Sequence, residues 1–215
     1  SAFRAFLDQI AQTTKDTATL QWVGQTLVDL AETSMPPGAT KATGQSAELL
    51  KVAVSTFERV KAGSSDVPLQ VEFQLATAQR MLGNYGDAVK SYAAILSKKP
   101  MMLDAQVDAA LAYEQWAQIV PEKYTVAAFQ KALNGAKPDG QGKNLIWGWG
   151  KVSLLTNGKA QYQDMFFNAR YHVALCRYRA GKKSNSKPLM EKAKSDITKV
   201  HALYPAMGGE THYLK

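Results

Sequence analysis

The sequence has little of what catalytic and metal sites are usually built from. Its 215 residues include one cysteine, Cys176, and three histidines. A single thiol excludes an internal disulfide and any metal site that needs several cysteine ligands. No HExxH motif or closely spaced His/Cys/Asp set accompanies the histidines, which are His172, His201 and His212. We therefore expect no metal, no cofactor and no catalytic residue, and we interpret Cys176 as a small core residue.

Long apolar runs are missing as well. No stretch approaches the roughly 18 consecutive apolar residues that a bilayer span requires, and the N-terminus lacks the charged-then-apolar pattern of a signal peptide. The chain as given is expected to be soluble. Because it starts at Ser1 without a methionine, we expect a processed product or a fragment of a longer protein. The sequence does not distinguish a cytoplasmic from an exported location.

Strand-like alternation is nearly absent, whereas apolar residues recur at spacings of three and four over most of the length. Proline and glycine clusters separate these periodic segments into lengths typical of globular helices. The fold class predicted is all-α. Helices are expected near residues 2–13, 17–34, 46–62, 67–82, 85–98, 102–118, 122–136, 143–156, 161–180 and 187–203.

One segment, Val71 to Pro100, combines several spaced features of a helix pair. Small residues such as Ala76 and Ala88 permit a close helix crossing, and Gly83 can adopt the left-handed conformation that ends the first helix. Pro100 cannot continue the second helix. Together with the aromatic positions Tyr85 and Tyr92, this pattern resembles the tetratricopeptide repeat, a helical hairpin of about 34 residues.

The resemblance continues in weaker copies on both sides. It implies a right-handed superhelical solenoid of antiparallel helix hairpins, here one repeat domain over residues 1–215 that is a fragment of a longer repeat protein. The opening helix reads as the second half of a hairpin without its partner. The hairpins expected are 17–62, 67–100, 102–138 and 161–205, with an extra helix at 143–156.

The extra helix contains the sequence IWGWG, in which Trp147 and Trp149 alternate with glycines. The glycines mark places where a neighbouring helix could approach closely. A phosphate-binding loop is not supported, since the GxxxxGK[ST] spacing and a preceding strand are both missing. Acidic residues on the predicted helix 102–118, Asp104, Asp108 and Glu114, are interpreted as a solvated face.

In tetratricopeptide proteins the first helices of the repeats line a concave groove that receives peptides or partner helices. Two groove positions in some members hold lysine and asparagine, which grip a peptide carboxylate. Phe73 and Thr77 occupy them here, so this clamp is not expected. The groove positions implied by the resemblance are Gln70, Phe73, Thr77, Arg80, Asp104, Val107, Leu111, Glu114, Asn168, Tyr171, Leu175 and Tyr178.

The function expected is that of a non-catalytic scaffold that binds another protein or a peptide in this groove. One alternative is a purely structural repeat segment of a larger multidomain protein. The other is weak nucleic-acid binding through basic loops, which the net charge of +8 permits but does not favour. That alternative uses Trp147 and Trp149 as stacking platforms beside Lys143, Lys151, Lys159, Lys182, Lys183 and Lys187.

Overall fold

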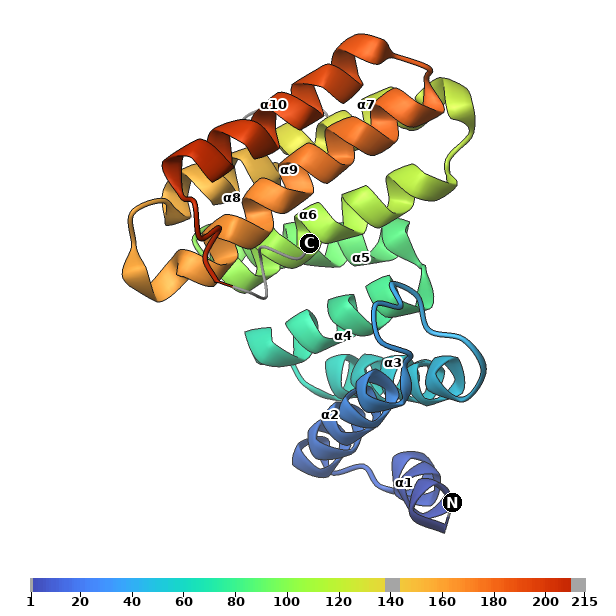
Figure 1. Cartoon of the computed structure of the whole chain (residues 1–215). Helices are drawn as coiled ribbons and strands as arrows, with labels where there is room; N and C mark the ends of the chain where they lie inside the picture. The colour runs from blue at the N-terminus through green and yellow to red at the C-terminus, as the bar shows by residue number, and fades with distance from the viewer. Residues whose placement is uncertain (1, 138–143, 210–215) are drawn as a thin grey trace. The chain divides into compact units, whose positions relative to one another are not determined.

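The computed structural model describes residues 2–137 and 144–209, and over these residues the chain is helical, without a strand (Figure 1). An isolated bridge between Ala136 and Ile146 is the nearest approach to sheet pairing that the described residues make. The predicted all-α class is confirmed. None of the helices in this part of the chain has the length and apolar character needed to cross a membrane.

Most helix boundaries lie within a few residues of those predicted. The helices are α1 (Ala2–Thr13), α2 (Thr17–Ser34), α3 (Gly44–Gly63), α4 (Leu69–Leu82), α5 (Tyr85–Lys98), α6 (Leu103–Ile119), α7 (Glu122–Asn134), α8 (Gly148–Thr156), the short 3-10 helix η1 (Ala160–Tyr162), α9 (Gln163–Lys183) and α10 (Lys187–Leu203).

The largest difference is at α8, which begins at Gly148 instead of residue 143. Ile146 is not part of the helix because it exchanges both backbone hydrogen bonds with Ala136. Pro138 and Lys143, which the sequence analysis also named, lie outside the described residues.

The chain divides into two compact units, Ser1–Ile95 and Leu96–Lys215. In the first unit, α2 and α3 pack along each other and α4 packs on α3. Gly24 of α2 packs directly against the Phe57 ring of α3, since a Cβ added at Gly24 would lie 2.6 Å from that ring. The core of this unit is mostly aliphatic and includes Leu20, Val23, Leu27, Leu50, Ala53, Phe57, Val60 and Leu75.

Local signals set the helix ends of the first unit. The Asp16 carboxylate accepts a hydrogen bond from the Thr19 backbone amide at 2.7 Å and so caps α2. At the end of α4, Gly83 has a φ of +85°, with its amide bonded to the Arg80 carbonyl and the next amide bonded to Gln79. This is the left-handed helix stop predicted for Gly83.

The segment with the clearest repeat pattern forms the helices α4 and α5. Ala76 and Ala88 are both fully buried, as the predicted close crossing requires. The hydroxyl groups of Thr77 and Tyr92 lie 3.2 Å apart, so these side chains join α4 to α5. The Phe73 ring lies 6.1 Å from the Tyr92 ring, centre to centre.

In the second unit, α6 packs on α7 and α9 packs on α10, while α8 contacts α6, α7 and α9 (Figure 1). A close backbone approach positions α8. Gly148 has a φ of +71°, and a Cβ added there would lie 2.4 Å from the Gly135 nitrogen and 2.8 Å from the Ala132 carbonyl oxygen. The IWGWG glycines therefore do allow a neighbouring helix, α7, to come close.

Candidate functional site

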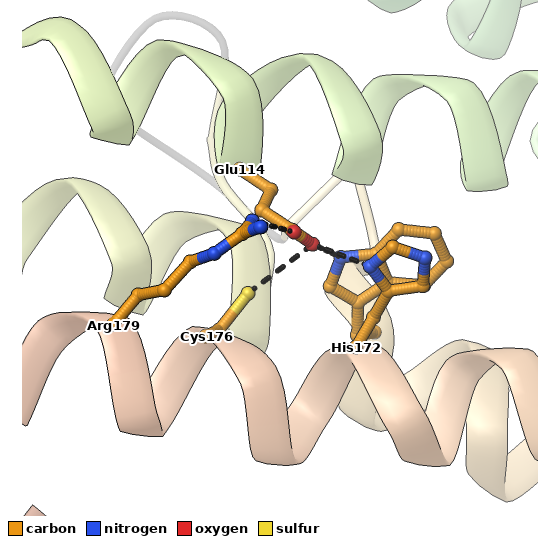
Figure 2. Close-up of polar contacts among 5 residues, drawn as sticks. Glu114, His172, Cys176 and Arg179 are labelled. Atoms are coloured by element: carbon orange, nitrogen blue, oxygen red, sulfur yellow. Dashed lines mark hydrogen bonds and ion pairs between the residues drawn. The ribbon is translucent and has the colours of Figure 1, made fainter. Parts of the chain in front are cut away.

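The second unit contains a buried polar cluster centred on Glu114 of α6. The side chain of Glu114 is 2% exposed, and Figure 2 shows its carboxylate facing three residues of α9. Oε1 accepts a hydrogen bond from Arg179 at 2.8 Å, and Oε2 accepts from His172 Nδ1 at 2.7 Å. The Cys176 thiol lies 3.4 Å from Oε2. We call Glu114, Trp149, His172, Cys176 and Arg179 the Glu114 cluster.

Trp149 of α8 completes this cluster from another direction. Its indole nitrogen donates to Glu114 Oε2 at 2.9 Å, and its ring stacks on the His172 ring at 4.3 Å between centres, with the planes 10° apart. Because a carboxylate only accepts hydrogen bonds, Nδ1 of His172 must hold the hydrogen in this contact. One carboxylate thus joins α6, α8 and α9.

The surroundings of Glu114 fit a residue that holds helices together better than they fit a catalytic residue. Its oxygens are occupied by charged and neutral donors, which offset the cost of removing the carboxylate from water. The thiol next to it is held in its neutral form. Burial, followed by the negative charge of Glu114, raises the pKa of Cys176 well above its ordinary value. A neutral, buried thiol is a poor nucleophile.

Cys176 is therefore expected to be inert in the folded protein. A thiol-specific reagent such as a maleimide should leave it unmodified in buffer at neutral pH and modify it fully in concentrated urea. Intact-mass measurement over time distinguishes the two states. Rapid modification without denaturant would contradict the structure, because both the burial and the raised pKa oppose thiolate formation.

A second buried polar side chain on α6 holds the segment that leads into α8. Gln106 is fully buried, and its amide nitrogen donates to the carbonyl oxygens of Pro100 and Leu145, each at 3.0 Å. Its amide oxygen accepts from the Trp147 backbone at 2.8 Å. Gln106 thus uses both ends of its amide to fix this segment against α6.

These contacts correct two interpretations drawn from the sequence. Glu114 does not belong to a solvated face, because it lies beneath α8 and α9. Trp147 and Trp149 are 6% and 1% exposed, so neither ring is available to stack on a nucleic-acid base. The interpretation of Cys176 as a core residue is confirmed by its full burial. No local pattern separated Glu114 from Asp104, which is exposed, or from Asp108, which is half-buried, on the same helix.

The second unit also has an open apolar hollow between α9 and α10. It has a volume of about 480 Å³, within the range of ligand pockets. On α9 the lining residues recur at helical spacing along one face, and Ile197 and Val200 face them from α10. The α9 lining consists of Phe167, Arg170, Tyr171, Ala174, Leu175 and Tyr178. We call this feature the α9–α10 hollow.

The groove positions implied by the repeat resemblance differ in their surroundings. Tyr171, Leu175 and Tyr178 line the α9–α10 hollow, and Asn168 lies half-buried on the same helix. In the α6 set, Asp104 is exposed, Val107 and Leu111 are half-buried, and Glu114 is buried. In the α4 set, Gln70 is exposed, Phe73 and Arg80 are half-buried, and Thr77 is buried against Tyr92.

Among the described residues, no group of three or more His, Cys, Asp or Glu side chains is placed to hold a metal ion. Comparisons with protein-family models, with curated proteins and with solved structures found no match to this chain. The candidate site is consequently defined by geometry alone, and it consists of the α9–α10 hollow together with the Glu114 cluster that supports α9.

Proposed function

We propose that this protein is a non-catalytic scaffold that binds a segment of another protein in the α9–α10 hollow. The observation that supports this most directly is the exposure of large apolar side chains on that face. Tyr178 is 46% exposed and Ile197 is 39% exposed, beside a hollow lined mostly by apolar groups. Apolar surface of this kind gains free energy when a partner removes it from water.

The proposal includes a tetratricopeptide-like solenoid architecture. The consecutive pairs α2–α3, α6–α7 and α9–α10 each pack as neighbours, which is the arrangement that the repeat resemblance implies. The Gly83 helix stop and the buried alanines of α4 and α5 support it further. In this architecture the face of α9 is a surface that receives a partner.

The Glu114 cluster supports the proposed role by fixing α9. His172, Cys176 and Arg179 lie on the side of α9 that faces Glu114, while Tyr171 and Tyr178 lie on the side that lines the hollow. One face of α9 is therefore anchored by hydrogen bonds, and the other face lines the hollow and is accessible to a partner. A rigid surface binds with less loss of conformational freedom than a mobile one.

A displayed library of random peptides, selected on the intact chain, tests this function. We expect the selected peptides to bind the wild-type protein and to lose about 30-fold in affinity on Tyr178→Ala, since truncating a central aromatic anchor commonly costs about 2 kcal/mol. Tyr124→Ala is the matched control, because Tyr124 is a similarly exposed tyrosine of α7 outside the hollow. An empty selection, or equal loss with both variants, would overturn the proposal.

A further inference from the structure

The charge of the α9–α10 pair points to the chemistry of its occupant. The two helices contain nine lysines and arginines against three aspartates and glutamates. The pair therefore has a net charge of +6, out of a net charge of +8 for the whole chain. Two of the nine basic groups are in ion pairs, Arg177 with Asp196 and Arg179 with Glu114 of α6, and the other seven still outnumber the other two acidic groups. A partner with negative charge is therefore favoured here.

Basic groups also border the hollow itself. Arg170 of α9 and Lys194 of α10 both belong to its lining, with Glu191 as the acidic exception. Arg170 also borders an adjoining smaller hollow, in which Lys199 takes part. An apolar floor with cations at its edges is complementary to a segment that has an apolar stripe flanked by acidic side chains.

The lining favours a helix over an extended peptide. An extended strand would bring unpaired backbone groups against a floor with few polar partners, and unpaired groups of this kind are costly when buried. A helix satisfies its own backbone. The described residues also offer no strand edge that an extended peptide could join. The floor runs from Phe167 to Tyr178, about 17 Å along α9, which corresponds to three turns of an added helix.

We infer that the α9–α10 hollow binds an acidic amphipathic helix of a partner protein. The inference rests on the proposed function and adds the class of partner. A second copy of this chain is a poorer occupant, because a two-fold interface would bring two such basic faces together. Nucleic acid is poorer as well, since the floor formed by Ala174, Leu175 and Val200 offers no polar group to a phosphate.

Two synthetic helical peptides of about 18 residues, long enough to overlap the three turns, test the inference. Both have leucines on one face; one has glutamates elsewhere and the other has lysines. We expect fluorescence anisotropy with the full chain to give at least tenfold tighter binding of the glutamate peptide at about 50 mM salt. The preference should shrink at about 500 mM salt because exposed charges are screened.

A pair of α10 variants places the effect at the hollow. Lys194→Glu should weaken binding of the glutamate peptide about tenfold, because it sets a like charge against the peptide. Lys192→Glu makes the same charge change at an exposed position of the same helix outside the lining, and should change binding less than twofold. Equal effects of the two variants would indicate attraction by net charge alone and would overturn the assignment.

The remaining outcomes separate this inference from the function on which it rests. Equal or tighter binding of the lysine peptide overturns the acidic preference, while Tyr178-dependent binding of either peptide leaves the scaffold function standing. Library peptides without an acidic amphipathic pattern also overturn the inference.

Two further results would assign the hollow to a different occupant. Displacement of the glutamate peptide by a single-stranded oligonucleotide would indicate nucleic acid, and a dimer that dissociates on Tyr178→Ala would indicate a second copy of this chain. If neither peptide binds and the library yields no binder, the proposed scaffold function is wrong.

Discussion

Replacing Glu114 by alanine is expected to destabilise the unit formed by residues 96–215 by about 3–5 kcal/mol, the usual cost of removing one partner from a buried ion pair. The substitution leaves Arg179 and His172 without their carboxylate and leaves the Trp149 indole nitrogen without its acceptor. Urea unfolding followed by tryptophan fluorescence measures the change, since three of the four tryptophans lie in this unit.

Asp104→Ala is the matched control for this substitution. Asp104 is an exposed acidic residue in the first turn of the same helix, so its removal should cost less than about 1 kcal/mol. If Glu114→Ala lowered the free energy of unfolding no more than Asp104→Ala does, the Glu114 cluster would contribute nothing to holding α8 and α9 on α6. The proposed rigid presentation of the α9 face would then lose its structural basis.

Gly148→Ala is expected to have an effect of at least similar size, more than about 4 kcal/mol, because the added Cβ meets backbone atoms that cannot move aside. The nearest of these atoms is the Gly135 nitrogen at 2.4 Å. Gly158→Ala provides a close comparison. Gly158 has nearly the same φ, +72° against +71°, but no atom lies within 4 Å of its added Cβ.

The comparison of these two glycine variants isolates the close approach from the backbone conformation. Gly158→Ala should cost only the left-handed backbone energy of about 1–2 kcal/mol. The excess for Gly148→Ala, measured by the same urea unfolding, is then the steric cost of placing a Cβ against the backbone at the end of α7. Equal losses in the two variants would show that the backbone approach at Gly135 is looser than the structure places it.

Helix positions were predictable from the sequence because the signals for them are local. The apolar periodicity of α2, α5 and α10 and the glycine stop at Gly83 act within one or two turns of chain. The same holds for the α9 face. Tyr171, Leu175 and Tyr178 are spaced by four and three residues, so their common side could be inferred without knowledge of what packs behind it.

The Glu114 cluster could not be predicted in the same way. The partners of Glu114 follow it by 35 to 65 residues in the chain, so nothing in its immediate sequence marks it as buried. A glutamate on a helix is typical of a solvent-exposed position. The glycines of IWGWG indicated that some element would come close, yet they could not specify that the element is the end of α7.

The long sequence separations within the Glu114 cluster also have a consequence for folding during synthesis. When α6 and α7 have just left the ribosome, His172 and Arg179 have not yet emerged, and the Glu114 carboxylate still depends on water for its hydrogen bonds. The second unit can close only after α9 is complete. Because these contacts join residues 35 to 65 positions apart, we expect the unit to fold later and more slowly than a hairpin whose contacts are all local.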